Sequence, residues 1–160
     1  MNYLNIQNNA ALSSLSGIQN ITSLTEIFIT GNGALTSLNG LENITSLDHL
    51  YIQANATLTT LSGIQNITSL IDLQISGNVA LTNLSDLENL SSLEHLYIDG
   101  NTALTSLNGI HNIPSLSGLT IAGNLGLTTL SALENLNSLE SFKIENNDAL
   151  TNLEGIQNIT

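Results

Sequence analysis

The chain has 160 residues, the length of one ordinary domain, and it is 41% hydrophobic but only 3% aromatic, so its core must consist of Leu and Ile. Thirteen acidic residues against one Lys and no Arg give a net charge of -12, which excludes nucleic acids and anionic membrane surfaces as partners, because both require clustered Lys and Arg. The absence of cysteine excludes disulfides, thiolate metal sites and cysteine nucleophiles, and no apolar run is long enough for membrane insertion.

A repeat of 23 residues runs through the whole sequence. Each repeat contains a motif that ends in an asparagine, for example Leu24-x-x-Ile27-x-Ile29-x-x-Asn32. The seven asparagines are Asn9, Asn32, Asn55, Asn78, Asn101, Asn124 and Asn147. Self-similarity at roughly 20–30 residues is typical of a solenoid, whose coils cannot bury their apolar faces alone. We therefore expect a single array over residues 1–160, with seven coils that start near residues 1, 24, 47, 70, 93, 116 and 139.

Within one repeat, the spacing of apolar residues predicts the local structure. The alternation of Ile27 and Ile29 predicts a short strand over residues 26–30, with both side chains facing inward. The other apolar residues of that repeat recur every third position, which favours 3₁₀-like or extended arcs over an α-helix; they are Leu35, Leu38, Leu41 and Ile44. The repeats thus predict a stack of parallel strands, joined by arcs with little or no α-helix.

Asparagines form two ladders in the predicted stack. The seven that close the phrase lie directly above one another, and a buried amide there must bond to backbone groups of its own and the next coil. A second ladder consists of Asn20, Asn43, Asn66, Asn89, Asn112, Asn135 and Asn158. It creates glycosylation-like triplets, but the asparagine persists where the triplet is lost, as in Asn112-Ile113-Pro114. Both ladders are therefore interpreted as structural.

The repeated phrase resembles the leucine-rich repeat family over the whole chain. The resemblance implies a curved solenoid with its parallel sheet on the concave side, 3₁₀ or extended arcs on the convex side, and ligands bound at the sheet. The consensus sequence Leu-Thr-Ser-Leu-x-Gly-Leu-x-Asn-Ile-Thr-Ser-Leu is similar to that of repeat arrays in large secreted or surface proteins of bacteria, notably Bacteroidota. An extracellular or cell-surface location is what this similarity implies.

Sequence variation is concentrated at the outward positions of the predicted strands. These positions hold four of the five aromatic residues, two of the three His residues and the only Lys. The densest group, which we call the patch, consists of Phe28, His49, Tyr51, Asp72, Gln74, His95, Tyr97 and Asp99. Exposed aromatic residues on a rigid face are typical of recognition surfaces, and rings flanked by acids and amides suit a sugar chain or a protein loop. The alternative is that Tyr and Phe only stabilise the sheet by cross-strand pairing.

Two chemical hypotheses arise from the row formed by His49, Asp72 and His95. A metal ion would need both His nitrogens within about 2.1 Å, although the two residues start on coils roughly 9.6 Å apart, so we favour hydrogen bonding and charge pairing around Asp72. A catalytic triad with Ser76 fails because that residue lies about 13 Å along the strand from Asp72. We therefore expect no enzyme, no metal and no cofactor.

A regular column of threonines permits a further alternative function. The column comprises Thr36, Thr59, Thr82, Thr105, Thr128 and Thr151, and such ladders resemble the flat faces of ice-binding solenoids. The neighbouring column is irregular, which argues against an ice-binding face.

The two ends of the sequence carry no polar capping coil. The first residues lead directly into a strand phrase, so we expect no signal peptide, and core edges such as Leu4, Ile6, Ile156 and Ile159 should be exposed. We accordingly expect a segment of a longer array. A structural spacer, or an element that self-associates end to end, is the alternative to a recognition module.

Overall fold

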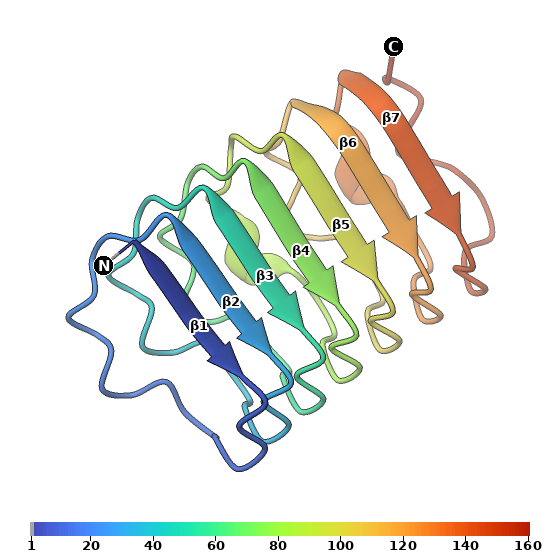
Figure 1. The fold of residues 1–160 in the computed structure, drawn as a ribbon. Coiled ribbons are helices and arrows are strands. Elements are labelled where there is room, and N and C mark those ends of the chain that lie inside the picture. The colour runs from blue at the N-terminus through green and yellow to red at the C-terminus, as the bar shows by residue number, and fades with distance from the viewer. Residues whose placement is uncertain (1) are drawn as a thin grey trace.

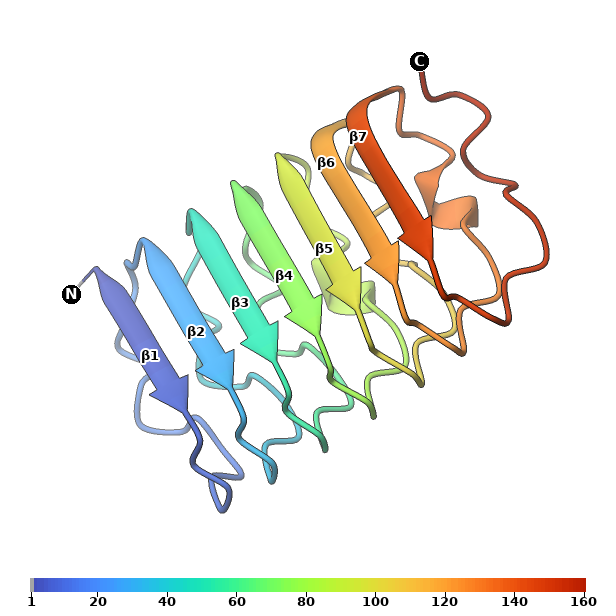
Figure 2. The same cartoon turned by 45° about the vertical axis from the view of Figure 1, so that its right-hand side comes forward.

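The computed structural model describes residues 2–160 and consists of seven parallel strands in one sheet. The strands follow one another in chain order, as Figures 1 and 2 show, and each is one coil further along the stack. They are β1 (Tyr3–Gln7), β2 (Glu26–Thr30), β3 (His49–Gln53), β4 (Asp72–Ser76), β5 (His95–Asp99), β6 (Ser115–Ala122) and β7 (Ser138–Glu145). The predicted solenoid is confirmed, and the predicted strand over residues 26–30 has the same bounds in the structure.

Every strand pairs with its neighbour at the 23-residue period. Ile27 lies beside Leu50, and Ile29 beside Ile52, with all four side chains fully buried. The residues between them point to the other face, because successive side chains of a strand alternate. A core of Leu and Ile thus fills the inside of each coil and leaves one face of the sheet to solvent.

The last two strands are longer than predicted, with eight residues each against five in β1 to β5. Pro114 directly precedes β6, and its carbonyl accepts the backbone N–H of Asn137 at 2.9 Å. Proline fixes φ near -65° and keeps the preceding residue extended. Pairing between β6 and β7 begins at Ser115 and Ser138, and an isolated bridge between Ser69 and Ser92 forms at the equivalent position without a proline, so the proline is compatible with the longer strand but is not required for it.

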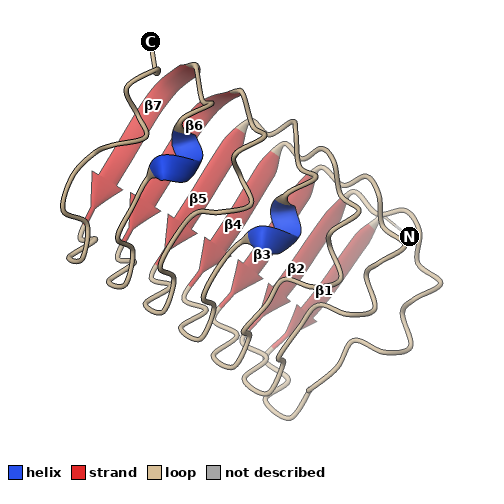
Figure 3. Cartoon of the chain, turned by 180° about the vertical axis from the view of Figure 1, so that it is seen from behind, coloured by secondary structure: helices blue, strands red, loops and turns tan. Residues whose placement is uncertain are grey.

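The arcs behind the sheet are turns and extended segments, interrupted by two short 3₁₀ helices, η1 (Ser85–Leu87) and η2 (Ser131–Leu133) (Figure 3). In the third coil the equivalent turn contains Gly63 with φ of +119°, where an added Cβ would lie 2.0 Å from the Leu38 carbonyl oxygen. Asp86 and Ala132 replace this glycine in the coils that carry the helices. Neither residue tolerates the left-handed conformation as glycine does, so the backbone forms a 3₁₀ turn instead. No helix within residues 2–160 could cross a membrane.

The first asparagine ladder holds adjacent coils together inside the core. The Asn78 side chain donates to the carbonyl of Ile52 in the preceding coil at 2.9 Å and to Ser76 in its own coil at 3.3 Å. Its Oδ1 accepts the backbone N–H of Asn55 at 3.1 Å. The predicted bonding within the same coil is confirmed. The backbone groups of a neighbouring coil that the side chain contacts belong to the preceding coil, and the next coil is reached through the Asn101 side chain, whose Oδ1 accepts from the Asn78 amide at 3.4 Å.

The second ladder makes one repeated bond at the surface. The side-chain amide of every member after Asn20 donates to the carbonyl 24 positions earlier, for example from Asn89 to Gln65 at 3.0 Å and from Asn112 to Glu88 at 2.7 Å. Its exposed asparagines therefore have the structural role that the sequence predicts.

The end coils bury less of their apolar surface than the middle coils. Leu4 and Ile6 in β1, and Ile156 and Ile159 in the last arc, are partly buried, and Leu153 is 53% exposed. The core edges are thus accessible as predicted, although the four named side chains keep some cover.

Candidate functional site

The patch lies on the solvent face of the sheet, over β2 to β5. Parallel register arranges it in three rows, and the sequence places every residue of the patch in the row where the structure has it. The rows are Glu26, His49, Asp72 and His95; then Phe28, Tyr51, Gln74 and Tyr97; then Thr30, Gln53, Ser76 and Asp99. Because the strands are rigidly paired, these side chains keep fixed relative positions.

The aromatic residues form a stack at the β1 side of the patch. The Phe28 and Tyr51 rings are 4.6 Å apart between centroids, with an interplanar angle of 15°, and Tyr3 packs against Phe28 at 5.6 Å and 59°. The His49 ring lies nearly parallel to Tyr51 at 6.4 Å. Gln74 separates Tyr51 from Tyr97, which is 41% exposed and lies outside the stack.

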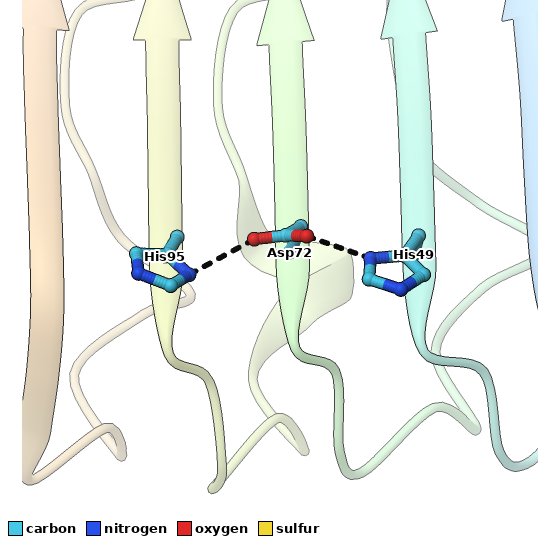
Figure 4. A network of polar contacts seen from close by, with 3 residues as sticks. All are labelled: His49, Asp72 and His95. Carbon is cyan, nitrogen blue, oxygen red and sulfur yellow. Dashed lines mark hydrogen bonds and ion pairs between the residues drawn. The ribbon is translucent and has the colours of Figure 1, made fainter.

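Asp72 accepts a hydrogen bond from each of the two histidines that flank it. The Nδ1–H of His49 donates to Oδ2 at 2.6 Å, and the Nδ1–H of His95 donates to Oδ1 at 3.0 Å (Figure 4). An ionised carboxylate only accepts hydrogen bonds, so both Nδ1 atoms must carry a proton. The predicted hydrogen bonding around Asp72 is confirmed.

The alternatives for this row receive no support from the geometry. Among residues 2–160, no group of three or more His, Cys, Asp or Glu side chains is arranged to hold a metal ion. The Ser76 hydroxyl donates to Asp99 at 3.4 Å rather than to either histidine. Asp72 therefore orients the two imidazole rings and links β3, β4 and β5.

The hydroxyl of Tyr51 lies in a negative environment. Burial raises its pKa above the ordinary value of 10.0, and the charges of Asp72 and Glu26 raise it further, as does Tyr97. The phenol therefore stays protonated at neutral pH and can donate a hydrogen bond to a ligand.

Two residues outside the predicted patch take part in it. Tyr3 extends the aromatic stack by one coil, and its hydroxyl accepts a hydrogen bond from the Asn5 amide at 2.7 Å. Glu26 lies in the same row as His49 and acts electrostatically on Tyr51. Both residues occupy outward positions of the predicted strands, and this position was the signal in the sequence that could have identified them.

The threonine column is partly occupied by structural bonds. Hydroxyls of Thr59, Thr105 and Thr128 donate to the carbonyl of the threonine one coil earlier, at 3.3, 3.5 and 3.2 Å. These hydroxyls join coils to one another, which leaves them less available to order water.

Two hollows on the surface lie away from the patch. One of about 200 Å³ is bordered by Glu94, Ser117 and Glu140 near the starts of the last strands, and none of its lining residues belongs to the patch. The patch itself is an open surface, and such a surface suits an extended ligand better than a small enclosed molecule.

Comparison of the chain with protein-family models, curated proteins and solved structures finds no match. Its classification as a parallel β-solenoid therefore rests on the single sheet and on the 23-residue register.

Proposed function

We propose that the chain is a non-catalytic recognition module of the leucine-rich repeat type, which binds a protein or a glycan on the solvent face of its sheet. The observation that carries this proposal is the concentration of aromatic, histidine and carboxylate side chains over β2 to β5, in an otherwise monotonous array. Aromatic residues supply contact area at little cost in conformational entropy, and histidine, amide and carboxylate groups supply directional bonds. The resemblance of the repeats to bacterial surface arrays supports an extracellular location.

Stabilisation of the sheet is the competing explanation for the aromatic residues. A stacked pair such as Phe28 and Tyr51 contributes about 0.5–1.5 kcal/mol beyond its buried area, and the two rings are 4.6 Å apart. Tyr97 lies outside the stack and is 41% exposed, so its ring contributes less to the sheet. Its effect on binding is the sharper test.

The experiment measures binding and unfolding on the same variants. Tyr97→Ala should weaken the binding of a ligand selected on the wild-type chain by at least about tenfold, which is roughly 1.4 kcal/mol, with a nearly unchanged melting temperature. Adding Tyr51→Ala should abolish binding and lower the melting temperature by the loss of its ring contacts with Phe28 and His49 and of its buried area. Leu125→Ala is the matched control, because it removes a 48% exposed apolar side chain that belongs neither to the patch nor to the aromatic stack. Loss of stability with intact binding would favour the purely structural explanation.

Self-association through the two ends of the sheet is a second candidate function, alongside a role as a spacer. β1 and β7 are edge strands, and a hollow of about 210 Å³ near β7 is lined by the apolar side chains of Ile144, Leu150 and Leu153. Edge strands with accessible apolar neighbours can pair with a second chain in a head-to-tail manner. Light scattering over a range of protein concentrations tests this, and a strict monomer at high concentration rules it out.

A further inference from the structure

Two aromatic rings of the patch, those of Phe28 and Tyr51, present their edges rather than their stacked faces to solvent. The centroids of Phe28 and Tyr51 are 4.6 Å apart with nearly parallel planes, which is close to the spacing of neighbouring strands at about 4.8 Å. The planes therefore stand upright on the sheet, and each ring faces the next along the stack. Phe28 is covered on both faces, by Tyr51 and by Tyr3.

Covered ring faces make the stack a poor platform for a neutral sugar. Sugar rings pack their C–H groups against the electron-rich faces of aromatic rings, and here Tyr51 and Tyr3 lie against Phe28 while Phe28 covers one face of Tyr51. Ring edges and the upright phenol of Tyr51 still offer apolar contact and a hydrogen bond. The aliphatic stem of a long side chain can lie against such edges while its polar head reaches further.

Charge on the patch has one sign. The outward positions of β2 to β5 include three carboxylates, Glu26, Asp72 and Asp99, and no Lys or Arg. The only Lys of the chain, Lys143, lies on β7 and pairs with Glu145 at 2.7 Å. Of the three carboxylates only Asp72 belongs to an ion pair among residues 2–160, so Glu26 and Asp99 keep their charge available.

From this arrangement we infer that the partner is a protein segment that presents Arg or Lys side chains to the patch. This inference rests on the proposed recognition function and specifies its ligand. Glu26 and Asp99 would pair with the cationic heads, while the stems lie on the edges of Phe28 and Tyr51. The net charge of -12 on the whole chain would also accelerate the approach of such a partner.

The two carboxylates also define the spacing of the cationic residues. Glu26 is on β2 and Asp99 on β5, three strand intervals (about 14 Å) apart across the sheet and four residues (about 13 Å) apart along the strands, which corresponds to a separation of about 19 Å. An extended chain that crosses the sheet diagonally covers this distance in about six residues. The bound segment therefore carries its two cationic side chains at roughly that separation.

Selection from a displayed library of random peptides of about ten residues tests this inference. The wild-type chain is the bait at physiological ionic strength, where the Debye length of about 8 Å restricts attraction to local charges. Enriched peptides should contain Arg or Lys in excess. They should bind the double variant Glu26→Gln/Asp99→Asn about tenfold more weakly than the wild type.

A charge-matched control separates the patch from the acidity of the whole chain. Glu88→Gln/Glu134→Gln removes the same two charges from exposed residues that directly follow η1 and η2, on the side of the coil opposite the strands (Figure 3). The affinity of the selected peptides for this variant should fall by less than about twofold. Equal melting temperatures of both variants and the wild type establish that only the charge pattern differs.

The outcomes distinguish this inference from the recognition function itself. Enriched peptides without excess Arg or Lys, or equal weakening in both variants, would overturn the cationic partner. A panel of neutral oligosaccharides is tested in parallel, and binding that Tyr51→Ala/Tyr97→Ala abolishes would also overturn it, while the recognition function stands. If neither peptides nor oligosaccharides bind the patch, both proposals are refuted.

Discussion

Truncation of Asn78 to alanine should be among the most damaging single changes in the middle of the array. The side chain is fully buried, and its Oδ1 accepts the backbone N–H of Asn55 at 3.1 Å, while its amide donates to Ile52 at 2.9 Å. Asn78→Ala leaves that N–H without a partner inside the core, and it removes the bonds of the amide to Ile52, Ser76 and Asn101. An unsatisfied buried group costs about 1–3 kcal/mol and each further lost bond about 0.5–1.5 kcal/mol, so we expect a loss of roughly 3–5 kcal/mol.

Equilibrium unfolding in guanidinium chloride, followed by far-ultraviolet circular dichroism, measures this loss. Asn89→Ala is the matched control, because that exposed amide makes one bond, to the Gln65 carbonyl at 3.0 Å, and its removal should cost about 1 kcal/mol or less. A loss below about 1 kcal/mol for Asn78→Ala, or equal losses for the two variants, would refute the assigned role of the buried ladder.

Three further predictions concern single residues of the sheet face and the turns. Asp72→Asn should lower the pKa of Tyr51, because it removes a negative charge that raises it, and ultraviolet titration of the phenolate measures the change; an unmoved pKa contradicts the assignment. Ala54→Gly should raise the free energy of unfolding by about 0.5–1 kcal/mol, since Ala54 has a φ of +53°; destabilisation in urea titrations would disprove this. Gly63→Ala should destabilise the chain by more than about 2 kcal/mol, because the new Cβ meets the Leu38 carbonyl oxygen and φ is +119°; calorimetry that finds no loss would show that the turn can rearrange.

The period and the alternation of apolar residues were enough to predict the sheet. Ile27 and Ile29 are two positions apart, so both side chains point to the same face of the strand. Because the repeat is exactly 23 residues long, only a strand pairing shifted by 23 residues places all such pairs in the core. The same register places His49, Asp72 and His95 in one row, so their hydrogen bonds could be expected before any coordinates. In a regular repeat, the position of a residue within its repeat therefore predicts which residues of the adjacent coils lie beside it.

Features that depend on side-chain rotamers or on local exceptions could not be predicted in this way. The contact between Tyr3 and Phe28 is diagonal across two rows, and only the orientation of both rings reveals it. η1 arises where Asp86 replaces the glycine of a tight turn. The replacement is visible in the sequence, but its consequence follows only from the positive φ angle that the structure gives for the equivalent glycine, Gly63. The added length of β6 and β7 has no single-residue signal, because Ser69 and Ser92 form the equivalent bridge in coils without a proline.

The most direct test of the recognition function is the map of amide chemical-shift changes on titration with a ligand selected on the wild-type chain. The proposal predicts that the largest changes fall in β2 to β5, around Tyr51, Asp72 and Tyr97. Changes confined to the arcs around η1 and η2, or to the edges at β1 and β7, would contradict it.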